Sequence, residues 1–166
     1  DYLPAVFTFT NHPITVLRPG TQVRYITTPE QRTRLLKAQG IQLVVGLEFT
    51  LEDSRVTAQD FAALLVETLG MKGLLMGPDS AVGHNRQGDI NFLRQIGPQL
   101  GFWVEEVQPL VLDGSLVQSR RIREAIGWGE VATGTRLLGR NFSLAGKVVL
   151  GDRRGRDLGF PTANLE

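Results

Sequence analysis

Short apolar runs alternate with amphipathic stretches through most of the chain, and this alternation predicts strands separated by helices. The apolar runs predict strands over residues 5–9, 41–47, 73–76 and 102–107. The amphipathic stretches predict helices over residues 28–39, 57–69, 91–100, 119–126 and 130–138. Because the strands are continuously apolar, we expect an α/β fold whose parallel sheet is covered by helices on both faces.

Residue types at the ends of the predicted helices support these boundaries. Thr28 can accept a hydrogen bond from the first helical turn, Pro29 suits the first helical position, and Gln31 stands at the capping-box spacing. Gly40 and Gly70 follow the last periodic positions of their helices and favour termination there.

The pattern changes after Gly139, where β-like segments replace the helical periodicity. We therefore predict a first domain over residues 1–139 and the start of a second domain over residues 140–166. The chain begins at Asp1 in a strand-like run and stops at Glu166, so we expect a fragment in which both domains are truncated. A parallel sheet that lacks a strand exposes an edge, and we expect the first domain to be loosely packed.

Composition narrows the class of protein without deciding it. The 166 residues are 42% hydrophobic and 21% charged, which is typical of a globular protein with a core. A net charge of +1 gives no overall attraction to nucleic acid or acidic membranes, so neither is an expected partner. Cysteine is absent, which excludes disulfides and thiolate chemistry within these residues and fits a cytoplasmic location. No apolar run is long enough to span a membrane, and the oligomeric state stays open.

Two polar segments follow predicted strands, where parallel sheets bind their ligands. His12 follows the first strand and could contact a phosphate or ribose, or could be a turn histidine bonded to backbone. Asp79 and Gly83 lie in residues 77–89, a glycine-rich stretch that suits either a ligand-binding loop or a plain connection.

Basic residues gather at the start of the helix predicted from Ser119. Ser119 can cap this helix, and its positive end suits a polyphosphate. Arginines at positions 120, 121 and 123 are unfavourable toward the helix macrodipole, so Arg121 and Arg123 imply an anionic partner. A solvated basic face is the alternative interpretation.

The C-terminal stretch combines glycine, arginine and two neutral oxygen ligands. Gly151 and Gly155 allow backbone N–H groups to approach a phosphate, and Arg156 adds charge-assisted hydrogen bonds. Thr162 and Asn164 offer side-chain oxygens suited to a hydrated Mg²⁺. A flexible basic hairpin between two strands is the alternative interpretation.

The order of residues in this stretch is more specific than its composition. A glycine-rich flap followed by Gly-Phe-Pro-Thr-Ala-Asn resembles the riboflavin kinase signature. The resemblance implies that the flap, which includes Gly151, Gly155 and Arg156, covers the phosphates of ATP. It also implies that Thr162 and Asn164 bind Mg²⁺ and ATP while the terminal phosphate moves to riboflavin.

The first domain resembles the other half of the bifunctional riboflavin kinase/FMN adenylyltransferase (FAD synthetase) family. Residues 9–13, 77–83 and 118–123 are similar to its motifs Phe-Asp-Pro-His-Pro, Gly-x-Asp-Phe-x-Phe-Gly and Ser-Ser-Thr-Arg-Ile-Arg. The resemblance implies a nucleotidyltransferase-type, Rossmann-like parallel sheet, followed by the first strands of a riboflavin kinase β-barrel. The flavin contacts that it implies are His12, Asp79 and Gly83. The ATP-phosphate contacts that it implies in this domain are Ser119, Arg121 and Arg123.

The first-domain motifs are incomplete in this chain. The residues that depart from them are Thr10, Asn11, Ser80, Val82, Gln118 and Arg120. The His-x-Gly-His motif of such nucleotidyltransferases is absent, and we expect it upstream of these residues. The fragment itself is therefore predicted to be inactive.

The resemblance predicts that the parent protein phosphorylates riboflavin to FMN and adenylylates FMN to FAD, with ATP as co-substrate and Mg²⁺ as cofactor. A kinase-only enzyme with a degenerate first domain is an alternative, and a non-catalytic flavin or nucleotide sensor is another. A different adenylyl- or cytidylyl-transferring enzyme would fit the first domain but not the riboflavin kinase segment.

Overall fold

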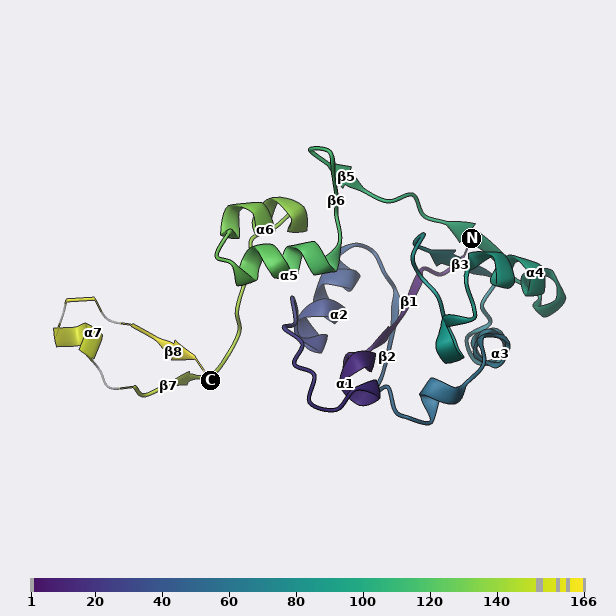
Figure 1. The fold of residues 1–166 in the computed structure, drawn as a ribbon, viewed down its shortest axis with the longest axis horizontal. Coiled ribbons are helices and arrows are strands. Elements are labelled where there is room, and N and C mark those ends of the chain that lie inside the picture. The colour runs from purple at the N-terminus through teal and green to yellow at the C-terminus, as the bar shows by residue number, and fades with distance from the viewer. Residues whose placement is uncertain (1, 152–153, 158, 161, 166) are drawn as a thin grey trace. The chain divides into compact units, whose positions relative to one another are not determined.

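A computed structural model describes residues 2–151, 154–157, 159–160 and 162–165, without the side chains of residues 156 and 157. The chain divides into two compact units, Asp1–Ser119 and Arg120–Glu166 (Figure 1).

A first pair of parallel strands opens the N-terminal unit. β1 (Ala5–Phe9) pairs with β2 (Leu43–Leu47), and the register runs from Ala5 opposite Leu43 to Phe9 opposite Leu47. The chain between them forms α1 (Pro13–Leu17) and α2 (Pro29–Ala38). The strand predicted over residues 5–9 is confirmed, whereas β2 begins two residues later than the predicted 41–47.

A second parallel pair lies further along the same unit. β3 (Gly73–Met76) pairs with β4 (Trp103–Glu106) and is preceded by α3 (Ala58–Leu69). The connection contains α4 (Ile90–Leu100), so all three central helices lie within two residues of their predicted bounds. Short 3₁₀ turns occur at η1 (Asp53–Arg55) and η2 (His84–Arg86), and β5 (Val111–Leu112) forms a hairpin with β6 (Ser115–Leu116).

The strands do not join one covered parallel sheet in the part of the chain that the structure describes, which corrects the expectation from the apolar pattern. They form separate 2-stranded sheets, β1–β2 and β3–β4. Each of these strands therefore has one hydrogen-bonded neighbour, and parts of its faces stay in solvent. Leu43, Leu47 and Leu75 are accordingly 38%, 49% and 60% exposed.

The predicted capping signals determine where the helices begin and end. Thr28 and Gln31 form a reciprocal capping box at the start of α2, with hydrogen bonds of 3.2 and 3.0 Å. Thr57 accepts a hydrogen bond from the Asp60 amide at 3.1 Å and caps α3, which ends at Gly70 in a left-handed conformation.

The core of the N-terminal unit lies between α3, α4 and the second strand pair. Ala62, Met76, Leu93 and Phe102 are buried together, and partly buried apolar side chains including Val82 pack against them. Leu93 is fully buried, so α4 is anchored by a side chain that has no access to water.

The second unit contains helices followed by a small hairpin. α5 (Ser119–Gly127) and α6 (Val131–Leu138) confirm the two predicted helices, and Gly134 of α6 allows close approach of Ile126 from α5. β7 (Val148–Val149) pairs antiparallel with β8 (Asn164–Leu165), and the intervening chain contains α7 (Arg154–Asp157). No helix in the described ranges is long and apolar enough to cross a membrane.

Candidate functional site

Hydrogen bonds from a side-chain amide fix the turn that follows β1. Asn11 donates from Nδ2 to the Phe49 carbonyl at 2.9 Å, and its Oδ1 accepts from the Phe49 amide at 2.8 Å. The Thr10 amide donates to the Leu47 carbonyl at 2.8 Å. The hydrogen bonding between β1 and β2 thus continues beyond the last strand residue, with the Asn11 side chain taking the part that a backbone peptide group plays within the strands.

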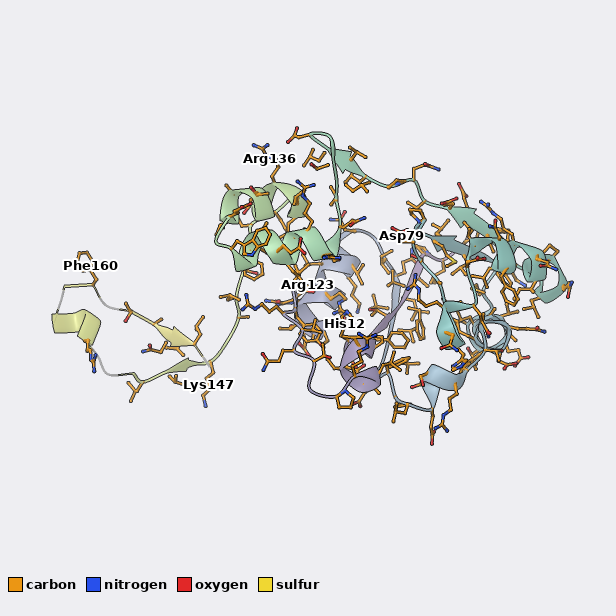
Figure 2. All side chains as sticks on the ribbon, in the orientation of Figure 1. His12, Asp79, Arg123, Arg136, Lys147 and Phe160 are labelled. Carbon is orange, nitrogen blue, oxygen red and sulfur yellow. The ribbon has the colours of Figure 1, made fainter. Side chains whose placement is uncertain are left out.

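His12 sits at the start of α1 and is bound to neighbouring groups (Figure 2). Its Nδ1 accepts from the Ile14 amide at 3.2 Å, and its own amide donates to the Tyr25 hydroxyl at 3.0 Å. The structure gives His12 the role of a turn histidine, and its contact with flavin stays a prediction.

The loop between β3 and α4 is seated closely on the start of α3. Gly83 has φ of 75°, and a side chain there would collide with the backbone N and Cα of Ala58. Val82 and Gly88 exchange two backbone hydrogen bonds of 3.0 Å, which close the loop above Ala58. Ala58 is fully buried as a result. These contacts fix the segment in which the sequence predicts a flavin site.

Polar contacts hold the rest of this loop. Asp79 is exposed, and its backbone carbonyl accepts a hydrogen bond from Arg86 Nη2 at 2.6 Å (Figure 2). His84 Nδ1 lies 2.7 Å from the Ser54 carbonyl, and His84 Nε2 lies 2.9 Å from Asn85 Nδ2. Asn85 and Arg86 have φ of 51° and 57°, a region that costs energy for residues with a Cβ. The loop therefore has a defined, strained shape.

The basic segment of α5 contains a buried arginine nitrogen that has no hydrogen-bond partner among the described residues. Arg120 pairs with Glu124 at 3.0 Å, while Ser119 and Arg121 are exposed. Arg123 is half-buried, and its Nε is buried without a hydrogen-bond partner among the described residues (Figure 2). A buried unpaired donor is costly, and an anionic ligand would satisfy it. This observation favours an anion at α5 over a merely solvated basic face.

The C-terminal hairpin brings its predicted phosphate and metal residues together in pairs. Gly151 lies against the Asn164 side chain, so closely that an added Cβ would overlap it. Gly155 lies against Thr162, whose Oγ1 would be 3.1 Å from such a Cβ. The Phe160 amide donates to the Gly155 carbonyl at 2.7 Å and closes this turn. The side chain of Arg156, also predicted to contact phosphate, lies outside the described residues.

Sequence reasoning did not find Arg32, which reaches β1 from the first turns of α2. Arg32 Nη1 donates to Thr8 Oγ1 at 2.9 Å and to the Phe9 carbonyl at 2.7 Å. One feature of the sequence points to Arg32. No carboxylate stands three or four residues before or after it, so the helix itself offers this arginine no ion-pair partner.

Sequence comparison identifies the family to which the N-terminal part of the chain is related. A family model described as FAD synthetase matches residues 1–121, which is more than half of the chain. The chain belongs to the FAD synthetase family. A second model, described as riboflavin kinase, matches residues 138–166, so the FAD synthetase segment is followed by a riboflavin kinase segment.

Curated relatives of this chain carry both activities in their names. It is 32% identical over 161 residues to the bifunctional riboflavin kinase/FMN adenylyltransferase of Escherichia coli K12, covering 96% of this chain and 51% of that protein. The enzyme of the same name from Pseudomonas fluorescens is 38% identical over 129 residues, covering 77% of this chain and 42% of that protein. The chain thus spans about half the length of such relatives.

A solved structure supports the fold of this FAD synthetase family member. A crystal structure described as a macrolide-efflux protein from Streptococcus pneumoniae has a TM-score of 0.86 and 32% sequence identity, covering 98% of this chain and 53% of that one. The efflux description belongs to that protein.

Proposed function

We propose that this chain takes part in flavin cofactor biosynthesis, in a bifunctional enzyme that phosphorylates riboflavin to FMN and adenylylates FMN to FAD with ATP. The observation that carries this proposal is the order of two family matches, FAD synthetase over residues 1–121 and riboflavin kinase over residues 138–166. We accordingly assign residues 1–139 to an adenylyltransferase domain of nucleotidyltransferase type and residues 140–166 to the start of a kinase barrel.

In the kinase step, the C-terminal hairpin would hold ATP and its metal. Thr162 and Asn164 are exposed residues with neutral side-chain oxygens, the donor type that Mg²⁺ accepts while keeping water and phosphate ligands. Gly151 and Gly155 lie beside these two side chains, because the absence of a Cβ lets Asn164 and Thr162 approach the backbone this closely. Bound Mg²⁺ would neutralise charge on the transferring phosphoryl group. Arg156 would add charge to the same flap.

In the adenylyl step, the α5 arginines would bind the phosphates of ATP. Arg123 is supported by its buried, unpaired Nε, and Ser119 and Arg121 are exposed beside it in the same helix. These donors would stabilise charge that develops on the α-phosphate and the leaving pyrophosphate. Asp79 and Gly83 would help to position the flavin, because their loop has a fixed shape and an exposed carboxylate.

A kinase-only enzyme is the second candidate. Val82 occupies a position where the family resemblance predicts phenylalanine, and it packs against the core of α3 and α4. A smaller apolar side chain directed into the core leaves less aromatic surface in the loop for a flavin ring.

The test is to express the complete reading frame containing this segment and to incubate the protein with riboflavin and Mg²⁺-ATP. Chromatography then follows riboflavin, FMN and FAD over time. FMN appearing first, followed by FAD, is the expected result. FMN accumulating without FAD would favour the kinase-only enzyme, and flavin binding without either product would favour a sensor.

A further inference from the structure

Arg32 places a positive charge at the carboxyl end of β1. Its side chain extends from α2 to the strand, where Nη1 donates both of its hydrogens, one to Thr8 Oγ1 at 2.9 Å and one to the Phe9 carbonyl at 2.7 Å. The residue is half-buried, so its guanidinium has lost part of its hydration. In open α/β folds, this end of a parallel strand is where ligands bind.

The partners of Arg32 are neutral, and its charge is not balanced by the protein in the described ranges. The one ion pair found there joins Arg120 and Glu124. Glu30, which lies closest in the sequence, interacts with its own backbone amide, with the Thr28 side chain and with Arg34. A partly desolvated cation without a counter-charge is unfavourable, and a bound anion would offset that cost.

The other edge of the guanidinium has the geometry for such an anion. Nε and Nη2 together carry three N–H donors, and none of them has a protein partner among the described residues. Two parallel N–H groups on one edge of arginine match two oxygens of a phosphate. Because Nη1 is hydrogen-bonded to β1, the Nε–Nη2 edge is held in one orientation before any ligand binds, and this lowers the entropic cost of binding.

The surrounding backbone is fixed as well. Asn11 is bonded in both directions to Phe49, and the His12 amide is bonded to the Tyr25 hydroxyl. The strand end to which Arg32 is bonded is therefore followed by a turn that is itself held by hydrogen bonds.

We propose that Arg32 binds a phosphate group of a substrate through its Nε–Nη2 edge. The inference deepens the proposed FAD synthesis, on which it rests, by assigning a phosphate subsite at β1. The phosphate belongs either to FMN or to ATP, and the kinetics distinguish the two.

The experiment uses the complete enzyme and the variants Arg32→Gln and Arg32→Lys. FAD formation from FMN gives KM for FMN and KM for ATP, and lumiflavin, a flavin ring without phosphate, gives an inhibition constant. Arg32→Gln should raise one of the two KM values by about tenfold or more, because it removes a charge-assisted bidentate contact. The inhibition constant of lumiflavin should stay within about twofold, since lumiflavin offers no phosphate to an arginine. A raised KM for FMN assigns the FMN phosphate, and a raised KM for ATP assigns the triphosphate.

Two control variants separate this role from a structural one. Arg34→Gln removes an exposed arginine from the same helix and should leave both KM values unchanged. Thr8→Val removes one structural hydrogen bond of Arg32 and leaves its ligand edge intact. The proposal is overturned if neither KM rises in Arg32→Gln, if lumiflavin inhibition weakens in parallel, or if Thr8→Val reproduces the effect.

The same variants also decide the proposal if Arg32→Gln fails to fold or if the wild-type enzyme makes no FAD. If Arg32→Gln does not fold, Arg32→Lys serves in its place, because lysine keeps the charge but lacks the paired N–H groups of the Nε–Nη2 edge. An unchanged KM for both substrates in Arg32→Lys would then refute the proposal. If the wild-type enzyme makes no FAD, the proposed function fails separately. Calorimetric titration of FMN and ATP into wild type and Arg32→Gln then decides, and equal dissociation constants would overturn the phosphate subsite.

Discussion

Replacing Gly83 with alanine tests whether the loop between β3 and α4 is held by steric fit. The new Cβ would meet the backbone N and Cα of Ala58, which cannot move aside as a flexible side chain could. A positive φ of 75° adds a cost of about 1–3 kcal/mol for a residue with a Cβ. The overlap adds about 1–3 kcal/mol more. We therefore expect the variant to lose about 2–6 kcal/mol of unfolding free energy.

Gly20→Ala is the matched control for this experiment. Gly20 also has a positive φ, of 89°, but an added Cβ there would meet nothing within 4 Å. Both positions have a positive φ, and of the two only Gly83 lies against other atoms, so the difference between the variants reports the overlap with Ala58 together with any difference in ψ. Thermal unfolding by circular dichroism should place the melting temperature of Gly83→Ala below that of Gly20→Ala, by about 2–4 °C for each kcal/mol of overlap. Equal melting temperatures would refute the claim that close steric fit between Gly83 and Ala58 holds this loop.

Three further predictions concern the core, a helix cap and the C-terminal hairpin. Leu93→Ala should lower the free energy of unfolding by about 2–5 kcal/mol in denaturant titration, because Leu93 is fully buried; a loss near zero would contradict the assigned core. Thr28→Val should cost about 1 kcal/mol by removing the α2 cap. In the folded protein the pKa of Glu30 lies below its ordinary value of 4.5, because the carboxylate accepts hydrogen bonds first from its own backbone amide and then from Thr28. Ionised Glu30 therefore stabilises the fold above pH 4.5, and this contribution is lost as the pH falls through the folded pKa. NMR titration should find this pKa raised again in Thr28→Val, and an unchanged value would count against the cap. Thr162→Ala and Asn164→Ala should each slow riboflavin phosphorylation at least about tenfold while FMN adenylylation is retained, as measured by chromatography; loss of both activities would point to misfolding instead.

Local signals in the sequence were sufficient to locate most helices. The Thr28 and Gln31 pair acts over three residues, and the cap at Thr57 also depends on its immediate neighbours. The late start of β2 is local too, because Gly40 and Ile41 follow α2 and cap its last turn, where the Ile41 amide donates to the Leu36 carbonyl. The five-residue α1 was missed because one turn of helix leaves no apolar periodicity to detect.

Features that depend on distant contacts could not be read in the same way. An apolar run indicates that a strand should be buried, but it does not say which element covers it, and Leu75 is 60% exposed. The contact between Arg32 and Thr8 joins residues that are 24 positions apart, so no local pattern in the sequence identifies Thr8 as the partner. The C-terminal motif was predicted from the order of its residues, whereas the contact between Gly151 and Asn164 depends on how the hairpin folds.

The reciprocal bonds between Asn11 and Phe49 constrain which substitutions position 11 can accept. One side chain must offer a donor and an acceptor at the reach of asparagine, so aspartate, leucine or lysine would each leave at least one Phe49 backbone group unpaired. The family motif that resembles this turn has proline at the same place, which fixes the backbone through its ring. We expect asparagine and proline to be two alternative ways of fixing the backbone after β1. An evolutionary exchange between them would therefore need compensating changes around Phe49, and position 11 should vary together with the end of β2 among related proteins.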